Sequence, residues 1–330
     1  MKTAWLFGPG NIAVHDEPEP CPVAGEVLLQ TELAGICGTD VSFYLGHRVV
    51  LYPFVLGHEV MGRVAAVGDE VTKFAVGQRV LVEPNYPCGS CRLCLAGRGA
   101  VCAQKGSPGV SLPGCFSEYF AAPAEFVWAL PDAISDQDAA TIEPLAVSLH
   151  GFVHSGAQAG DTIAVLGCGV VGLLLIHAAV AAGVRVIAHD RFANKLEMAR
   201  SLGAEPGQNV DTAQMWRQEN VTSIFECAGS PATIDLALKA APRASQVILL
   251  GLSSEPASFV PLRFVREGID IRTSMIYDHP KDFAHVIDQV ARGALHPSCV
   301  VTHTYPLESL GRALAHAGTG EAGKIHITMT

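Results

Sequence analysis

The sequence predicts an α/β protein that combines a β-rich part with a doubly wound parallel sheet. From about residue 25 to 131, short runs rich in β-branched residues alternate with Gly, Pro and acidic turns. From about residue 160, apolar strands alternate with helices rich in Ala and Leu. This alternation is typical of parallel strands joined by crossover helices.

The elements follow in order along the chain. In the β-rich part, strands are expected at 25–33, 58–68 and 77–84. In the second part, strands are expected at 162–166, 184–190, 223–229 and 246–251, with helices at 170–183 and 231–241. A helix at about 282–292 and a closing strand at 324–330 complete the pattern. There is no internal repeat of fixed period.

Composition excludes several function classes. The 330 residues are 49% hydrophobic and carry a net charge of −10 without a basic stripe, which argues against nucleic acid or a membrane surface as a partner. The first 20 residues hold no apolar run of ~7–15 residues, so we expect no signal peptide and a cytoplasmic location. The ten cysteines are then expected to be free, catalytic or metal-bound rather than bridged.

A glycine-rich turn follows the expected strand at 162–166. Its sequence is Gly-Cys-Gly-Val-Val-Gly, and Asp190 ends the next strand. Such glycines let the backbone approach a pyrophosphate at a helix N-terminus, and the carboxylate accepts a hydrogen bond from a ribose hydroxyl. Asp190 favours NAD because it repels a 2′-phosphate, whereas the adjacent Arg191 leaves NADP open. The cofactor-binding candidates are Gly167, Gly169, Val170, Val171, Gly172 and Asp190.

Four cysteines lie within fifteen residues, in a lobe expected at 84–103. They are Cys88, Cys91, Cys94 and Cys102. Four thiolates at such spacing favour a tetrahedral zinc site with no open position, hence a structural role. An iron–sulfur cluster and free thiols are the alternatives, although the gap before the fourth cysteine is longer than in ferredoxin motifs.

A dispersed set of donors offers a second metal site. It consists of Cys37 in GICGTD, His58 and Glu59 in LGHEV, and Glu143 in ATIEPL. One sulfur, one nitrogen and two carboxylates suit a zinc ion that keeps a position open for catalysis. Each residue alone is more often structural than a ligand.

Taken together, GICGTD, GHEVMGRVAAVG, the four cysteines, EPLAVSLHG and GCGVVG resemble the zinc-dependent medium-chain alcohol dehydrogenases. The EP segment is similar to that of the branch with sorbitol, threonine, butanediol and sugar-acid dehydrogenases. The resemblance implies a GroES-like catalytic domain at 1–147 and 271–330 around a Rossmann domain at 148–270. It also implies two zinc ions per chain, NAD, and a homodimer or homotetramer.

The resemblance also assigns residue roles. Cys37 and His58 match catalytic zinc ligands, and either Glu59 or Glu143 supplies the third. Thr39 matches the hydroxyl that passes on the alcohol proton, and Lys195 matches a basic residue near the adenosine ribose. The candidates for the substrate pocket are Phe43, His47, Phe116 and Tyr277.

The expected reaction is hydride transfer from a secondary alcohol, such as a polyol, diol or sugar-derived alcohol, to NAD, giving a ketone. Sorbitol dehydrogenases typically have Tyr where this chain has Phe43, and Arg where it has Ile276, and the loss of these two polar groups disfavours a long, fully hydroxylated polyol. Two alternatives remain: a non-enzymatic, zinc-stabilised dinucleotide sensor, and a zinc-free quinone or enoyl reductase on the same fold.

Overall fold

The computed structural model describes residues 1–207 and 211–329. The chain forms two compact units: unit 1 comprises Met1–Glu143 with Asp278–Thr330, and unit 2 comprises Pro144–Tyr277. The boundaries expected at 147/148 and 270/271 both fall inside unit 2. The reason at the second boundary is β14 (Asp270–Thr273), which pairs in parallel with β13 (Gln246–Leu249), so the chain leaves this sheet later than expected.

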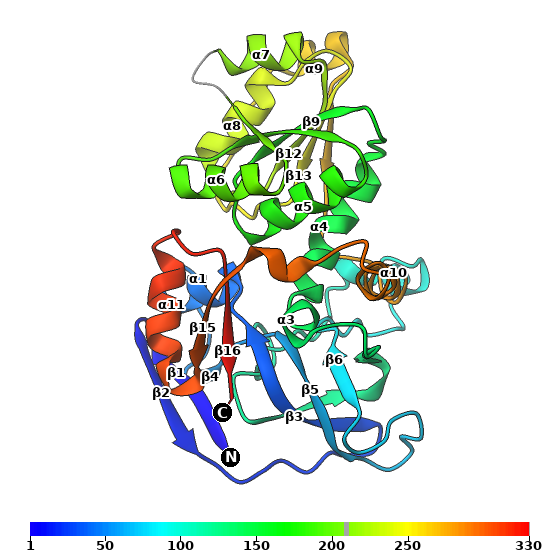
Figure 1. Ribbon diagram of the computed structural model, residues 1–330, viewed down its shortest axis with the longest axis vertical. Helices are drawn as coiled ribbons and strands as arrows, with labels where there is room; N and C mark the ends of the chain where they lie inside the picture. The colour runs from blue at the N-terminus through cyan, green and yellow to red at the C-terminus, as the bar shows by residue number, and fades with distance from the viewer. Residues whose placement is uncertain (208–210, 330) are drawn as a thin grey trace. The chain divides into compact units, whose positions relative to one another are not determined.

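Unit 1 is built on two sheets (Figure 1). A seven-stranded sheet has the order β15-β16-β3-β5-β6-β8, with β7 also paired to β3, and a three-stranded sheet has the order β2-β1-β4. Most pairs are antiparallel, and β15 and β16 are parallel. The strands are β1 (Lys2–Gly8), β2 (Asn11–Asp16), β3 (Glu26–Gly35), β4 (Phe54–Val55), β5 (Glu59–Val67), β6 (Arg79–Val82), β7 (Tyr119–Pro123), β8 (Val127–Ala129), β15 (Val301–Pro306) and β16 (Lys324–Thr328).

Helices of unit 1 cover its core or carry loops. They are α1 (Gly38–Tyr44), α2 (Arg92–Leu95), α3 (Asp136–Ala139), α10 (Lys281–Ala291) and α11 (Leu310–Gly318). Helix α10 shows why such segments fold: Phe283, Val286, Ile287 and Val290 recur at helical spacing, and all four are buried. Burial of that stripe stabilises the helix against the core.

Unit 2 is a parallel sheet with the order β11-β10-β9-β12-β13-β14. Its remaining strands are β9 (Thr162–Leu166), β10 (Arg185–His189), β11 (Glu205–Pro206) and β12 (Val221–Glu226). Its helices are α5 (Val170–Ala181), α6 (Ala193–Ser201), α7 (Thr212–Gln218), α8 (Pro231–Ala240), α9 (Pro261–Glu267) and most of α4 (Ile142–Ser155), whose first two residues belong to unit 1. The strand order reverses between β9 and β12, where such sheets bind ligands at their carboxyl ends.

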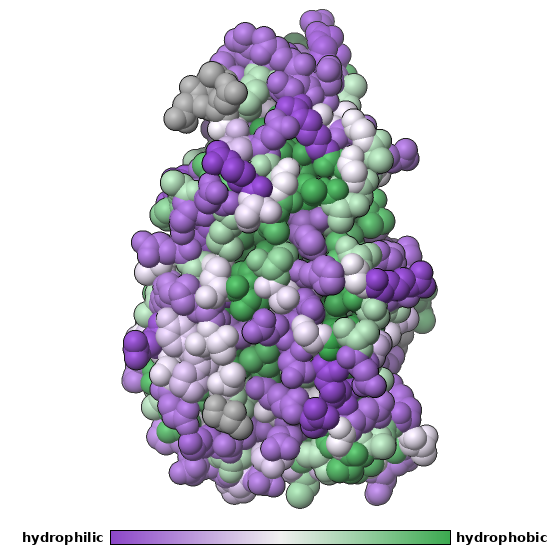
Figure 2. Space-filling model, in the orientation of Figure 1, coloured by the Kyte–Doolittle hydropathy of each residue, from purple (hydrophilic) through white to green (hydrophobic). Residues whose placement is uncertain are grey.

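The predicted fold class is confirmed in both units. Strand β9 is buried at every residue and α5 has seven buried residues, as expected for a central strand and its crossover helix. Hydrophilic side chains cover the outer helices of unit 2 around α6 and α7 (Figure 2).

The closing strand ends at Thr328, and Thr330 of the predicted range lies outside the described residues. Within 1–207 and 211–329, no helix has the length and apolar character needed to cross a membrane.

Candidate metal centres and dinucleotide site

Strand pairing brings the dispersed donors together. Antiparallel pairing of β3 with β5 sets Gly35 opposite Glu59. Cys37 follows the end of β3 by two residues, and His58 directly precedes β5. Ligand atoms of Cys37, His58 and Glu59 consequently lie within 4.8 Å of one another. We call these three residues the mixed-donor centre.

Asp40 connects the two segments that carry these donors. It lies in the first turn of α1, fully buried, and its Oδ2 accepts a hydrogen bond from the backbone N–H of Cys37 at 2.8 Å. Its Oδ1 accepts from the N–H of Gly57 at 3.0 Å, and the same oxygen lies 3.7 Å from His58 Nδ1. One carboxylate therefore fixes the backbone beside both Cys37 and His58.

Lys324 pairs with the carboxylate of the centre from the opposite end of the chain. Its ammonium donates to Glu59 Oε2 and to the carbonyl of Ile36, the latter at 2.9 Å. Lys324 is 0% exposed and Glu59 is 1% exposed. A Cβ on Gly35 would collide with both partners, so this pair requires glycine at position 35. A buried pair of this kind makes loss of either partner costly.

The charges of the centre shift its pKa values in opposite directions. Burial opposes ionisation of Cys37, but the neighbouring His58 and Lys324 lower the pKa of its thiol overall. Burial also opposes a charged His58, yet Asp40, Cys37 and Glu143 together raise its pKa to about 10. Burial lowers the pKa of Lys324 to about 8. Cys37 thus approaches the thiolate form that binds metals.

The donor set fits a zinc ion. A thiol, an imidazole and a carboxylate are all ligands that zinc accepts, and three protein ligands leave one position open. The His58 side chain is only 11% exposed, and its Nδ1 has no hydrogen-bond partner among the described residues. A carboxylate near such a ring is the usual means of orienting a histidine ligand, and Asp40 occupies that position.

Two further predicted site residues, Glu143 and Thr39, are not part of the mixed-donor centre. Glu143 is buried in the first turn of α4 and acts on His58 through its charge, and it is not among the residues whose ligand atoms lie within 4.8 Å. Thr39 is half-buried in the first turn of α1, two residues after Cys37. The inner-shell choice between Glu59 and Glu143 stays a prediction, and the geometry favours Glu59.

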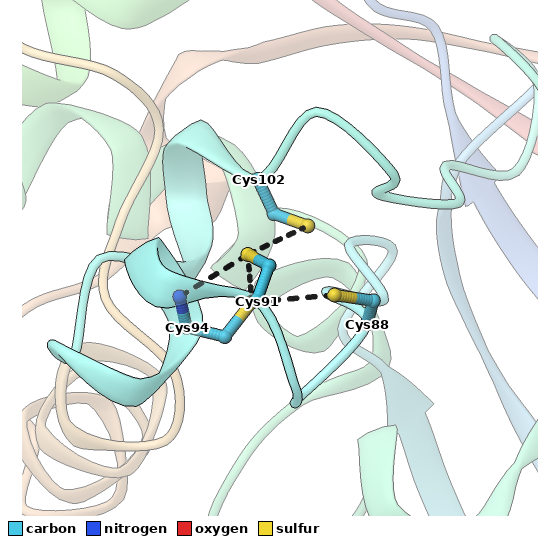
Figure 3. Close-up of side chains that lie close together, drawn as sticks. All are labelled: Cys88, Cys91, Cys94 and Cys102. Atoms are coloured by element: carbon cyan, nitrogen blue, oxygen red, sulfur yellow. Dashed lines mark hydrogen bonds between the residues drawn. The ribbon is translucent and has the colours of Figure 1, made fainter.

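The four clustered cysteines converge in a separate loop (Figure 3). The Sγ–Sγ distances are 3.4 Å for Cys91–Cys94, 3.9 Å for Cys91–Cys102 and 3.9 Å for Cys88–Cys94. Four sulfurs at ~2.3 Å from a central zinc would be separated by about 3.8 Å. Cys91 caps α2, where its Sγ accepts from the N–H of Cys94 at 3.5 Å. We call these four residues the cysteine lobe.

The thiol pKa values of the cysteine lobe shift in different directions. Burial and the thiols of Cys91 and Cys102 raise the pKa of Cys94, whereas backbone hydrogen bonds lower the pKa values of Cys88 and Cys91. The N–H groups of Ser90 and Cys91 lower the pKa of the Cys88 thiol to about 6. The N–H of Cys94 likewise lowers the pKa of Cys91. The base of the loop is closed by paired N–H and C=O groups of Tyr86 and Gly106 at 2.8 and 3.0 Å. The loop therefore holds its thiols together through local contacts.

The glycine-rich turn of unit 2 depends on missing side chains at two positions. Gly167 has φ +94°, and a Cβ there would lie 2.8 Å from the backbone N of Ala228. A Cβ on Gly172 would collide with the carbonyl of Gly167. Gly169 is the N-cap of α5, and Val170 and Val171 form its first turn. The turn thus leaves the N-terminus of α5 open to an anion.

Asp190 lies directly beside that turn. Its Oδ2 accepts from the N–H of Cys168 at 2.7 Å, and its Oδ1 accepts from the N–H of Phe192 at 2.9 Å. Arg191 lies over the Phe192 ring at 4.6 Å. Lys195 is buried on α6, and burial lowers the pKa of its ammonium although Asp190 opposes the shift. The carboxylate at the end of β10 is therefore fixed in place.

The candidates for the substrate pocket lie in different environments. Phe43 and Phe116 belong to the hydrophobic core of unit 1, and Phe116 packs against Gly57 beside the mixed-donor centre. His47 is exposed on the loop after α1, and Tyr277 is buried at the end of unit 2. A substrate contact by any of these four residues stays a prediction.

Sequence reasoning did not identify Asp40 and Lys324. Asp40 lies in the GICGTD motif, three residues after the N-cap Cys37. An acidic residue at this position often accepts a hydrogen bond from the N-cap N–H, so the sequence could have indicated its role. Lys324 begins the strand Lys-Ile-His-Ile-Thr, whose first four residues are all buried. A charged residue at a buried strand position indicates a partner but does not say which one.

Two family models match the chain. One describes the alcohol dehydrogenase GroES-like domain and matches residues 23–132. The other describes a zinc-binding dehydrogenase and matches residues 170–292. A sorbitol dehydrogenase of Bacillus subtilis (strain 168) is 33% identical over 332 residues, which cover 96% of this chain and 93% of the relative.

Two solved structures share the fold. An alcohol dehydrogenase, RspB, from Escherichia coli CFT073 in complex with NADH has a TM-score of 0.92 at 31% identity, covering 100% of this chain and 99% of that one. A zinc-binding dehydrogenase from Sinorhizobium meliloti 1021 bound to NADP has a TM-score of 0.92 at 30% identity, covering 99% and 98%. With matches over nearly its whole length, the chain belongs to the zinc-type medium-chain alcohol dehydrogenase family and is an oxidoreductase.

Proposed function

We propose that the protein is an NAD-dependent dehydrogenase that oxidises a secondary alcohol to a ketone at the mixed-donor centre. The observation that carries this proposal is the convergence of a thiol, an imidazole and a carboxylate within 4.8 Å. A zinc-free reductase on the same fold has no use for such a group. Both zinc sites are part of the proposal, one in the centre and one in the cysteine lobe.

Cys37, His58 and Glu59 would hold the catalytic metal, with Asp40 and Lys324 orienting them. A zinc ion bound there supplies Lewis acidity, which makes an alcohol hydroxyl easier to deprotonate. Lys324 competes for Glu59 Oε2 and leaves the other carboxylate oxygen for the metal. The cysteine lobe would hold a second zinc ion with a purely structural role.

Thr39 is proposed to carry the alcohol proton away from the centre. Its position in the first turn of α1, two residues after Cys37, supports this role. A hydroxyl group both accepts and donates a hydrogen bond, so it is suited to pass a proton to solvent. The hydride would leave the carbon that bears this hydroxyl, and a bound nicotinamide would accept it together with its electron pair.

NAD is the proposed cofactor because Asp190 is held beside the glycine-rich turn with its charge available to a ribose hydroxyl. We expect Asp190→Ala to raise the KM for NAD about tenfold or more, because it removes the acceptor, and to change the KM for NADP less or lower it. Kinetics with both cofactors measure this. A wild-type preference for NADP would assign cofactor choice to Arg191 instead.

A polyol, diol or sugar-derived alcohol is the proposed substrate. The similarity to a sorbitol dehydrogenase supports this class. The core position of Phe43 offers no hydroxyl to a substrate, which favours a shorter or less hydroxylated alcohol than sorbitol.

We further propose that the protein forms a homodimer or homotetramer. Strand β14 ends the parallel sheet, and all four of its residues are exposed. Helix α9 next to it in the chain exposes Leu262 and Val265. An open edge beside apolar side chains is a surface that a second copy would cover. Light scattering of the purified protein tests this, and a monomer at micromolar concentration would contradict it.

The enzymatic proposal is tested by zinc analysis together with a substrate panel. We expect two zinc ions per chain and NAD reduction with at least one secondary alcohol among polyols, diols, threonine and sugar acids, followed by nicotinamide absorbance. An iron spectrum would contradict the assignment of the cysteine lobe. Binding of NADH without turnover of any alcohol in the panel would favour the sensor alternative.

A further inference from the structure

A buried glutamate lies at the reversal point of the parallel sheet in unit 2. Glu226 is the last residue of β12, is 0% exposed, and pairs in register with Leu166 of β9. None of the roles described above uses it. A buried carboxylate is costly unless its oxygens are hydrogen-bonded, so its contacts identify what it does.

One carboxylate oxygen of Glu226 organises the turn that follows β12. Oε1 accepts from the N–H of Ala228 at 3.0 Å, from the N–H of Gly229 at 2.9 Å and from Thr233 Oγ1 at 2.8 Å. Thr233 lies in the first turn of α8, whose N-cap is Ser230. A single oxygen therefore fixes both the turn 227–230 and the start of the next helix.

That turn is the surface on which the glycine-rich turn rests. Gly167 approaches Ala228 so closely that a Cβ would lie 2.8 Å from the Ala228 backbone N and Cβ. The N–H of Cys227 donates to the carbonyl of Leu166 at 2.8 Å. A displacement of Ala228 would hence displace the backbone that forms the pyrophosphate site.

Glu226 also holds the turn after β13. Its backbone carbonyl accepts from the N–H groups of Leu250 and Gly251, both at 2.9 Å. A Cβ on Gly251 would lie 2.5 Å from Glu226 Oε2. Oε2 itself is buried and has no hydrogen-bond partner among the described residues. Glu226 thus connects the turns after β12 and β13, and the turn after β12 in turn supports the glycine-rich turn.

We propose that Glu226 is a positioning residue for dinucleotide binding, which acts by holding the turn 227–230 against the glycine-rich turn. The proposal rests on the proposed NAD-dependent function. It assigns no contact between Glu226 and the cofactor. Its effect should therefore appear in cofactor affinity rather than in zinc content.

The test measures the dissociation constant for NADH by its fluorescence in wild type, Glu226→Ala and Glu226→Gln. Alanine leaves two buried N–H groups without an acceptor, and we expect NADH binding to weaken about tenfold or more. Glutamine keeps an amide oxygen in the place of Oε1, so we expect it to bind within about threefold of wild type. Zinc content should stay unchanged in both variants.

A matched control separates positioning from general loss of stability. Glu83 is also 0% exposed, with Oε2 accepting from Trp128 and with its Oε1 unpartnered among the described residues, but it lies in unit 1. Glu83→Ala should lower Tm to a similar extent and leave NADH affinity unchanged. Wild-type NADH affinity in Glu226→Ala, or equal weakening by Glu83→Ala, would overturn the proposal.

A milder variant keeps the test decisive if Glu226→Ala does not fold. Thr233→Val removes one of the three donors to Glu226 Oε1, and we expect it to weaken NADH binding about fivefold. Thr233→Ser keeps the hydroxyl, so we expect it to restore NADH affinity. Unchanged affinity in Thr233→Val would then overturn the proposal. Failure of the wild type to bind either NADH or NADPH is a different result, because it contradicts the proposed function itself.

Discussion

The mixed-donor centre and the cysteine lobe are both groups of potential metal ligands in unit 1, but the chain assembles them in different ways. The lobe draws four thiols from residues 88–102, and local backbone hydrogen bonds hold them. The centre needs β3 and β5 to pair correctly before its donors meet. Lys324 reaches Glu59 only when β16 also pairs with β3. The lobe is partly exposed and uniform, whereas the centre is buried and chemically mixed.

In the proposed function, this difference separates a structural group from a catalytic one. Four identical thiolates around a zinc ion would leave it no open position, so the proposed role of the lobe is to stabilise the loop that bears it. A centre with three protein donors has room for a substrate, and its buried charges act strongly because little water screens them. The following predictions test this division, from the largest expected effect on turnover to the smallest.

The strongest test removes a ligand from the centre. In Cys37→Ala we expect turnover to fall by about 10³-fold or more, because the Lewis acid contributes several kcal/mol to the transition state. Zinc content should fall from two ions to one per chain, with the lobe retained. Near-normal turnover with a single zinc would assign catalysis to other groups.

A weaker effect is expected when the donors stay and their support changes. Asp40→Asn keeps the size of the side chain but removes its negative charge. It also replaces one of the two carboxylate oxygens that accept hydrogen bonds from the N–H groups of Cys37 and Gly57. We expect zinc affinity or turnover to fall about 10–100-fold, measured after competition with a chelator.

Asp138→Asn is the matched control for this change. Asp138 is also buried and accepts hydrogen bonds from Ser135 and Ser298, but it does not contact the centre. It should leave turnover per zinc-loaded chain within about threefold of wild type. Equal losses in the two variants would show that Asp40 acts only on stability.

The complementary test removes one thiol from the cysteine lobe. Cys91→Ser removes the thiol that caps α2 and meets two other sulfurs, so we expect one zinc per chain and a lower Tm. Turnover per folded, zinc-loaded chain should change by less than about threefold. A loss of turnover as large as that of Cys37→Ala would end the separation between the two groups.

The smallest effect concerns the pair formed by His279 and Glu83, the residue that directly follows β6. Burial opposes the charge on His279, but its hydrogen bond to Glu83 Oε2 at 2.8 Å raises its pKa overall. The pair's contribution to stability is therefore fully present below the unfolded pKa of ~6.5 and is lost as pH rises through the raised folded value.

Thermal melts of wild type and His279→Gln between about pH 5.5 and 9 measure this contribution. The Tm difference should be largest at the acidic end of this range and shrink at higher pH. A difference that grows with pH would contradict the assignment of the charge to His279. Turnover should be unaffected.

Prediction from sequence succeeded where the signal is local. The cysteine spacing, the glycine-rich turn and the alternation of strands and helices are each contained in a few tens of residues, and the fold class followed from them.

Contacts between residues that are far apart in the sequence could not be predicted from it. The pairing of Lys324 with Glu59 depends on the register of β16 against β3. The proposed role of Glu226 depends on contacts between turns that are far apart in the sequence. The pairing of β14 with β13 is likewise a contact that the sequence pattern does not reveal.

The pairing of Glu59 with Lys324 also orders events during synthesis. These residues are separated by 265 positions, so nearly the whole chain must leave the ribosome before the carboxylate meets its ammonium partner. The cysteine lobe needs only fifteen consecutive residues and can capture a metal ion far earlier. Under the proposed function, a nascent chain would acquire its first zinc before the mixed-donor centre is complete, because Lys324 reaches Glu59 only at the end of synthesis.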